Sequence, residues 1–279
     1  IRNCGMYNIG VIGNGFVGNA IYENMKYFYN LCVYDIDENK SYNTFQEVND
    51  TNIIFVCVPT PMSYKDGSFD LSIVKEAIND LSDGKILIIK STITPSAAEE
   101  IILEYPQHDF VFNPEFLSEK TAVEDFKNQK RIVLGGDPNI VSLVSALYVK
   151  VFPHCEYIET DYNTACFIKY FCNCFFAAKI SMMNEFHQIC EAEGADWDIA
   201  MRGLLSSGWV NPMHTMVPGP DGNYGFGGKC FPKDINAFIK YSEANNTDPV
   251  ILKAAWDKNL KIRNNYDWIK IKGAISTEE

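Results

Sequence analysis

The segment Gly13-Asn14-Gly15-Phe16-Val17-Gly18 decides the fold of this 279-residue chain, because it joins a short apolar run to a segment of helical spacing. In such a turn the first glycine permits a tight bend, the second lets a pyrophosphate approach the backbone, and the third allows close helix–strand packing. Asp35 ends the next predicted strand, where its carboxylate can accept hydrogen bonds from an adenosine ribose. The pattern predicts a dinucleotide site with NAD as the cofactor. The alternative is a glycine-rich structural turn.

The first half of the chain alternates β-rich runs with helical segments. The predicted strands are Tyr7–Ile12, Leu31–Asp35, Asn52–Val58, Ile86–Ser91, Phe110–Phe112 and Arg131–Leu134. The predicted helices are Phe16–Phe28, Leu71–Leu81, Ala97–Glu104 and Asn139–Val149. Several strands are nearly continuous apolar runs, as in strands that are buried on both faces of a sheet. This alternation predicts an α/β fold with a Rossmann-like, doubly wound parallel sheet.

The second half changes character near residue 155 and becomes helical. The helices predicted there are Tyr162–Glu193, Asp196–Leu205, Ile235–Asn245 and Pro249–Trp268. We therefore expect two domains, an NAD-binding domain over 1–157 and an all-α domain over 158–279 that carries substrate contacts. The long helix Tyr162–Glu193 is also a candidate element for a homodimer.

Composition narrows the possible partners. A net charge of −12 argues against general affinity for nucleic acid or an anionic membrane. We find no apolar run of eighteen residues and no signal peptide, so we expect no membrane partner. Nine cysteines without a secretion signal predict a reducing, cytoplasmic location. Cys166, Cys172 and Cys174 lack the spacing of zinc ligands and are expected in the core.

Polar residues follow several of the predicted strands. Val58-Pro59-Thr60-Pro61 ends the third strand and Lys90-Ser91-Thr92 ends the fourth. Because ligands bind beyond the carboxyl ends of strands in open α/β sheets, Thr60 and Thr92 can contact the cofactor or a catalytic water. Glu115 and Glu119 follow the fifth strand and can serve as base and cofactor contact. The alternatives are ordinary polar loop residues and a solvated helix start.

Two polar residues interrupt an aromatic stretch of the long helix. Lys169 and Asn173 are four residues apart and therefore share a helix face. Either the lysine extends its amine to solvent along the apolar surface, or it stabilises an oxyanion together with the Asn173 amide.

The run Gly225-Phe226-Gly227-Gly228-Lys229-Cys230-Phe231-Pro232-Lys233-Asp234 carries the strongest chemical signal. The glycines let backbone approach a ligand closely. Pro232 suits the first turn of a helix, and the positive end of that helix favours a thiolate at Cys230. Asp234 lies one turn further on, where it can act as an acid or base. The alternative is a buried, structural cysteine at a tight turn.

Together these motifs resemble the nucleotide-sugar 6-dehydrogenases, and the UDP-glucose 6-dehydrogenase family best. The matching segments are Gly13–Gly18, Asp35, Val58–Pro61, Ser91–Thr92, Asn113–Glu119, Arg131–Gly135, Lys169–Asn173, Asn184–Glu185 and Gly227–Asp234. The resemblance implies a second domain like the C-terminal domain of 6-phosphogluconate dehydrogenase. It also implies a four-electron oxidation of a nucleotide sugar, most simply UDP-glucose to UDP-glucuronate, with two NAD reduced.

The resemblance assigns a role to each matching residue. It implies that Cys230 captures the aldehyde as a thiohemiacetal, which is then oxidised to a thioester that water hydrolyses. It implies that Lys169 and Asn173 steady the C6 oxygen and that Asp234 helps to activate water or tunes the thiol. It also implies that Thr92 and Glu115 help with the water or proton and that Glu119 contacts the nicotinamide end. The implied cofactor contacts are Gly13, Asn14, Gly15, Phe16, Val17, Gly18, Asp35, Val58, Pro59, Thr60, Thr92 and Glu119. The implied substrate contacts are Phe116, Leu117, Lys169, Phe226, Gly227, Lys233 and His214.

The chain departs from the family in three places. The family's C-terminal nucleotide-binding domain is expected to be absent, since Ile275–Glu279 has the composition of a polar tail. The loop Asn211–Gly222 is long and lacks the family's arginine, near whose place His214 lies. Ser118 and Lys120 flank Glu119 where other residues are usual. Two alternative functions stay open: a two-electron β-hydroxyacid-type dehydrogenase that uses Lys169, and a non-catalytic protein that binds NAD or a nucleotide sugar.

Overall fold

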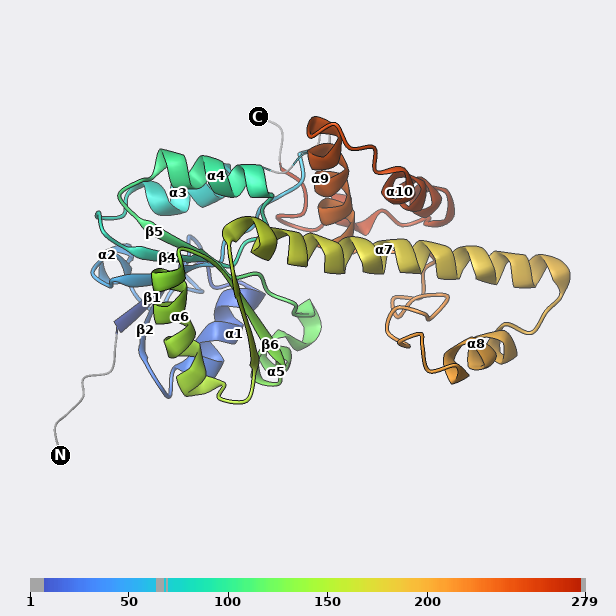
Figure 1. Cartoon of the computed structure of the whole chain (residues 1–279), viewed down its shortest axis with the longest axis horizontal. Coiled ribbons are helices and arrows are strands. Elements are labelled where there is room, and N and C mark those ends of the chain that lie inside the picture. The colour runs from blue at the N-terminus through green and yellow to red at the C-terminus, as the bar shows by residue number, and fades with distance from the viewer. Residues whose placement is uncertain (1–7, 64–67, 69, 277–279) are drawn as a thin grey trace. The chain divides into compact units, whose positions relative to one another are not determined.

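The structure is a computed structural model that describes residues 8–63, 68 and 70–276 (Figure 1). The strands are β1 (Asn8–Ile12), β2 (Asn30–Tyr34), β3 (Ile53–Val56), β4 (Ile86–Ile89), β5 (Asp109–Phe112), β6 (Arg131–Gly136) and β7 (Glu156–Thr160). The helices are α1 (Phe16–Met25), α2 (Phe45–Asn49), α3 (Ser72–Asn79), α4 (Pro95–Glu104), α5 (Ala122–Lys127), α6 (Pro138–Val151), α7 (Tyr162–Glu193), α8 (Trp197–Ser206), α9 (Phe231–Ala244) and α10 (Val250–Ile262). Two short 3-10 turns are η1 (Glu119–Thr121) and η2 (Asp267–Ile269).

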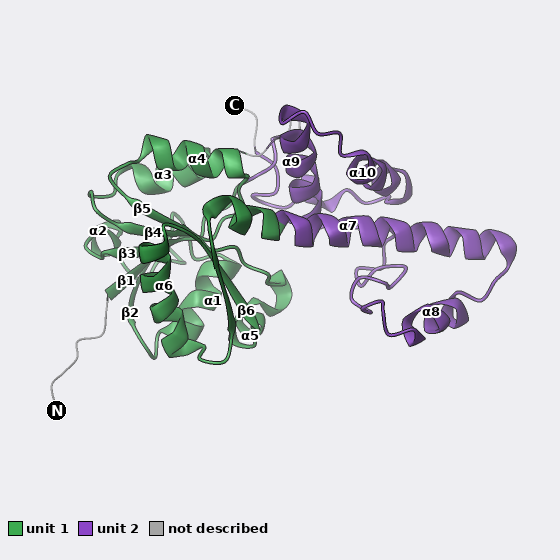
Figure 2. Ribbon diagram, viewed as in Figure 1, with its two compact units in different colours: residues 1–60, 70–169 green, residues 61–69, 170–279 purple. Residues whose placement is uncertain are grey.

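The chain forms two compact units (Figure 2). Unit 1 comprises residues 1–60 and 70–169, and unit 2 comprises residues 61–69 and 170–279. The boundary falls inside α7, after Lys169, whereas the sequence placed it before that helix. The segment after β3 joins unit 2 because Met62 exchanges backbone hydrogen bonds with the C-terminal stretch, at 2.8 Å to Ala274 and 2.8 Å to Ser276.

Unit 1 is the predicted Rossmann-like α/β domain. Its described strands form one sheet in the order β2-β1-β3-β4-β5-β6-β7. Helices α3 and α4 cover one face, and α1, α5 and α6 cover the other (Figure 1). The buried side chains of β1, β3, α1 and α6 form one continuous apolar core, which explains the nearly unbroken apolar runs of these strands.

One strand pairing corrects the expected all-parallel sheet, because β6 runs antiparallel to β5. The connection between them contains only η1 and the short helix α5, and an antiparallel neighbour needs no long crossover. The sequence also missed β7, α2 and α5. We also expected the last helix to end at Trp268. In the structure α10 ends at Ile262, because the next residue, Arg263, takes an extended conformation.

A buried polar network fastens this antiparallel junction, whose ladder joins only Val111 with Gly136 and Phe112 with Gly135. The amide of Asn113, directly after β5, donates to the Val133 carbonyl on β6 at 2.7 Å. The amide oxygen of Asn113 accepts from the Lys90 amine at 2.9 Å and from the Tyr148 hydroxyl on α6. Side chains from three elements thus supply bonds that the short ladder lacks.

Unit 2 is helical. Its core joins α7, α9 and α10 through Tyr170, Cys174, Phe226, Ile235 and Ala255. Among the described residues one helix, α7, is long and apolar enough to cross a membrane by length and composition, although we expected none; its most apolar window has a mean hydropathy of 1.2 and is 50% buried. Core helices of soluble proteins meet the same criterion.

Lys90 gives the fold a testable pH dependence. Burial lowers the pKa of this amine to about 8, with a smaller lowering from the Lys169 charge, against an ordinary value of 10.5. Between these two values the unfolded chain holds the proton that the folded chain has released, so the free energy of unfolding rises with pH. We expect wild type to gain about 2 kcal/mol relative to Lys90→Met between pH 7 and pH 10. Urea titrations at several pH values measure the difference, and a constant difference would contradict the assignment.

Candidate active site

The predicted cofactor loop joins β1 to α1, and its three glycines have different surroundings. Gly13 has a φ of +91° and lies against the Cys57 backbone. A Cβ at Gly18 would lie 1.9 Å from the Gly13 carbonyl oxygen, so the third glycine is required for close packing of helix and loop. A Cβ at Gly15, the N-cap of α1, would meet no described residue within 4 Å. The open space therefore lies at Gly15, where a phosphate can approach the helix N-terminus.

Asp35, directly after β2, supports this loop. Its carboxylate accepts the Asn14 backbone N–H at 2.6 Å and the Asp37 N–H at 2.9 Å. Each oxygen keeps acceptor capacity for a ribose hydroxyl, since a carboxylate oxygen can accept two hydrogen bonds. Among the described residues, nothing hydrogen-bonds to the buried amide oxygen of Asn14. The open Gly15, this unsatisfied acceptor and the Asp35 carboxylate fit an NAD molecule.

Residues at the ends of β3 and β4 lie together as expected. The Thr60 hydroxyl donates to the Thr92 carbonyl at 2.9 Å, and the Ser91 hydroxyl donates to the Val58 carbonyl at 2.6 Å. Thr92 also lines a small cavity with Asn113 and Lys169. Val58 and Pro59 are half-buried in this strand end. The buried Thr60 hydroxyl has a structural partner, whereas Thr92 presents part of its surface.

Lys169 does not extend to solvent, because its side chain is only 4% exposed and pairs with Glu115. The amine lies 3.1 Å from Oε1 of Glu115 and also donates to the Glu115 backbone carbonyl. The second carboxylate oxygen accepts the Leu117 N–H at 2.6 Å. The Lys169 amine lies over the Phe116 ring, 5.4 Å from the ring centroid. Unit 1 thus holds a buried Lys169–Glu115 ion pair, whose charges are little screened by water.

Glu119, the first residue of η1, is exposed and takes no part in the Lys169–Glu115 pair.

In unit 2, Cys230 is the N-cap of α9, as the sequence predicts. Asp234 lies in the first turn, is 1% exposed, and donates its backbone N–H to the Cys230 carbonyl at 2.8 Å. Its carboxylate accepts the Asn173 amide at 2.6 Å and pairs with Lys233. Asp234 therefore binds both Asn173 and Lys233 in the first turn of α9, the helix that Cys230 caps.

The loop before the thiol contains His214, which takes a left-handed φ of 63°. Its ring lies between Phe176 and Phe231, with centroid distances of 4.7 Å and 5.4 Å. Burial, with the nearby Lys179 charge, lowers the pKa of His214 below its ordinary value. The imidazole is therefore neutral at pH 7 and does not replace the charge of an arginine.

Several residues that shape the site carry no motif and were missed. Asn113 appeared only within a matching segment, and Lys179 was not singled out, although its amine holds the His214 loop through the carbonyls of Asn211 at 2.5 Å and Met213 at 2.7 Å. Asn259 and Arg263 were missed as well. Their only sequence signal is a spacing of four on a helix, which many surface residues share.

Comparison with known proteins identifies the family. Residues 37–152 match the NAD-binding domain of the UDP-glucose/GDP-mannose dehydrogenase family, and residues 163–261 match its central domain. The chain belongs to this family. A UDP-glucose 6-dehydrogenase from Rickettsia bellii is 32% identical over 90% of this chain and 66% of its own length. The structure of a UDP-glucose dehydrogenase from Pyrobaculum islandicum is 25% identical with a TM-score of 0.82, over 94% of this chain and 69% of its own.

A more distant structure shares the fold alone. It is 3-hydroxyisobutyrate dehydrogenase from Mycobacterium tuberculosis, 16% identical with a TM-score of 0.73, over 92% of this chain and 94% of its own. The chain spans 66% of the Rickettsia bellii relative and 50–55% of several other curated members of the family. The family match covers both an NAD-binding and a central domain, so NAD is the cofactor of unit 1.

Two glycine variants separate cofactor binding from packing. Gly15→Ala adds a methyl group to open space, so we expect weaker NAD binding and a stability loss of no more than about 1 kcal/mol, since alanine is a poorer N-cap than glycine. Gly18→Ala forces its Cβ into the Gly13 carbonyl, so we expect a loss of about 2 kcal/mol or more. Calorimetric NAD titration and urea unfolding measure the two effects, and equal stability losses would contradict this division of roles.

Proposed function

We propose that this chain oxidises the C6 alcohol of a nucleotide sugar to the acid, with UDP-glucose as the first substrate to test. Two NAD would be reduced for each sugar. The observation that carries the proposal is the group around Cys230, a thiol at a helix N-terminus with a buried Asp234 that binds Asn173 and Lys233. A two-electron dehydrogenase has no use for this thiol group. The names of the curated relatives also support it.

The groups of each unit have separate tasks in this proposal. In unit 1, Glu115 or a water at Thr92 takes the proton of the C6 hydroxyl. The Lys169 ammonium stabilises the negative charge that develops on the C6 oxygen. NAD held at Gly15 and Asp35 would supply the hydride acceptor for both oxidations, that of the alcohol and, with a second NAD, that of the thiohemiacetal. In unit 2, the Cys230 thiolate adds to the aldehyde carbon, and the resulting thioester is cleaved by water to the acid and the thiol. Asp234 fixes the Asn173 amide beside the C6 oxygen.

The remaining contacts follow from the same proposal. Glu119 contacts the nicotinamide end, and Phe116, Leu117, Lys233 and His214 contact the substrate. Phe226 is only 2% exposed, and Asn259 binds both its backbone N–H and its carbonyl, so any substrate contact in this part of the run comes from Gly227. We place the enzyme in the cytoplasm because its nine cysteines suit a reducing compartment.

We also propose that two copies associate through α7. Phe171, Phe175, Met182, Phe186 and Ile189 are each 40% or more exposed. Their spacing of three, four and seven places them on one helix face, as in a coiled-coil seam. An apolar stripe of this length on a surface marks an interaction site, and a second copy supplies a matching stripe.

Cys230→Ser tests the covalent step. We expect this variant to release no acid, because a serine hydroxyl is a far weaker nucleophile than a thiolate near neutral pH. Wild type should form two NADH per sugar, measured by absorbance and by chromatography of the product. Cys190→Ser, at a half-buried cysteine near the end of α7, is the matched control and should turn over normally.

The alternatives predict other outcomes. One NADH per substrate, unaffected by a thiol reagent, would indicate the β-hydroxyacid-type reaction. A thermal shift with NAD but no turnover on any nucleotide sugar would indicate a binding protein. Acid release by Cys230→Ser at the normal rate would exclude the covalent mechanism.

Phe175→Glu tests the dimer. Phe175 is 64% exposed, so the charge costs little in the monomer but would be buried in the seam. We expect dimeric wild type and a monomeric variant in sedimentation velocity at micromolar concentration. Ile251→Glu, at a 76% exposed residue of α10, is the control and should remain dimeric.

A further inference from the structure

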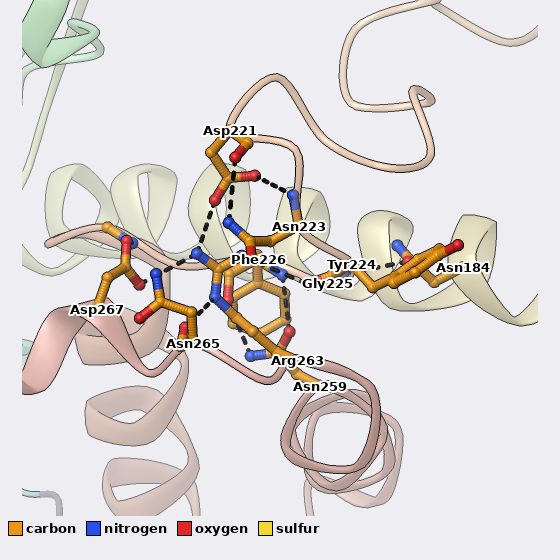
Figure 3. Close-up of polar contacts among 11 residues, drawn as sticks. Asn184, Asp221, Asn223, Tyr224, Gly225, Phe226, Asn259, Arg263, Asn265 and Asp267 are labelled. Atoms are coloured by element: carbon orange, nitrogen blue, oxygen red, sulfur yellow. Dashed lines mark hydrogen bonds and ion pairs between the residues drawn. The ribbon is translucent and has the colours of Figure 1, made fainter.

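The glycine-rich run that leads to Cys230 is enclosed by polar side chains from α10 and the segment that follows it (Figure 3). Asn184, on α7, accepts the Gly225 N–H at 3.1 Å. Asn259, on α10, and Asp267, in the segment after it, supply further bonds to the run. Arg263, directly after α10, binds Asp267 and the carbonyl of Tyr224, the residue just before the run. No motif or family match assigns these side chains a role.

Asn259 binds both backbone groups of one residue of the run, Phe226. Its Oδ1 accepts the Phe226 N–H at 2.7 Å, and its Nδ2 donates to the Phe226 carbonyl at 3.0 Å. Asn259 is 0% exposed, so both bonds lie away from water. The Phe226 ring packs against Trp256 and against Phe231, the residue after the thiol. The pairing therefore fixes backbone that is coupled to the start of α9.

Arg263 fixes the run from its other side. Its buried guanidinium donates to Asp221 at 2.7 Å and to Asp267 at 3.2 Å, and reaches the Tyr224 carbonyl at 3.4 Å. Asp267 in turn accepts the Gly228 N–H at 3.1 Å. Figure 3 shows the guanidinium between the two carboxylates. Arg263 and Asp267 thus connect α10 to a backbone group two residues before Cys230.

The same side chains explain why this run is rich in glycine. A Cβ at Gly225 would lie 2.2 Å from the Asn259 amide oxygen. A Cβ at Gly227 would lie 2.2 Å from the Arg263 guanidinium and 2.3 Å from the Asp267 carboxylate. We expected this space to admit a ligand. In the structure, protein side chains occupy it.

We propose that Asn259 and Arg263 are positioning residues that hold the Cys230 thiol at the start of α9 for capture of the aldehyde. The inference rests on the proposed function and adds the groups that keep the nucleophile in place. A displacement of about 1 Å at a reacting atom costs about 100-fold in rate. Loosening the run should therefore slow thiol capture selectively. The first oxidation, alcohol to aldehyde, needs no thiol and should continue.

Asn259→Ala tests this through the products. We expect the rate constant for acid formation to fall about 100-fold. The NADH formed per sugar consumed should fall from two toward one, with free aldehyde trapped by a hydroxylamine. The NAD dissociation constant should stay unchanged. Asn259→Asp keeps the acceptor for the Phe226 N–H and should give an intermediate ratio of aldehyde to acid.

Two further variants guard against a purely structural effect. Ser181→Ala removes another buried hydrogen bond to α10, from the Ser181 hydroxyl to the Ala255 carbonyl at 2.8 Å, without touching the run. Its product ratio should match wild type. Asp267→Ala frees the Gly228 N–H at a 30% exposed carboxylate, and should release aldehyde even if Asn259→Ala does not fold.

Hydrogen exchange tests whether Asn259→Ala loosens the run alone. Asn259→Ala should expose the Phe226 amide to exchange while the α9 amides beyond the first turn stay protected.

The products separate the failure of this inference from the failure of the proposed function. If wild type releases acid through Cys230 and both Asn259→Ala and Asp267→Ala do so with two NADH per sugar, the positioning role is wrong. If the variants release aldehyde to the same extent as Ser181→Ala, the effect is structural and the inference is again wrong. Normal turnover by Cys230→Ser would instead overturn the proposed function itself.

Discussion

The cofactor side of this protein depends on one constraint, that parallel strands end at a common edge of the sheet. The loops after β1, β2, β3, β4 and β5 therefore gather there, although their residues span a hundred positions of sequence. Each loop then needs only a local device to place its polar groups. Gly13 bends the first, Asp35 ties the second to the first, and Asn113 anchors the fifth.

The anchoring of Asn113 matters beyond the fold. Glu115 follows it by two residues and forms the buried pair with Lys169. Separating the partners of a buried pair leaves each charge uncompensated, so the loop that carries Glu115 has to be held in place. The bonds from Lys90, Tyr148 and Val133 fix the start of that loop from three directions. Side-chain bonds thus reinforce the short ladder between β5 and β6, and this junction leads directly to the candidate acid–base pair.

Sequence patterns predicted most of the elements because each left a periodic signal. Helix α7 was predicted with its observed ends, and the Gly13 turn and the Cys230 N-cap were placed correctly. The sequence patterns did not predict features that depend on contacts between residues far apart in the chain. The antiparallel direction of β6 depends on the connection between two strands and not on the residues of β6 itself. The helix pattern left two roles open for Lys169, because it could not show that Glu115, fifty-four residues away, is its partner. Asn259 and Arg263 resemble any polar pair on a helix face.

The two glycine-rich runs show why a motif alone does not define its purpose. At Gly15 the missing side chain leaves space that a ligand can use, and none of the described residues fills it. At Gly227 the missing side chain makes room for a guanidinium that belongs to the protein. Both runs bring backbone close to a polar partner. In the first, the open space suits a cofactor that exchanges, whereas in the second the partner belongs to the protein and is permanent. The proposed function accounts for this difference, because a hydride acceptor would have to leave after each step, whereas a thiol nucleophile would have to stay in one place through all of them.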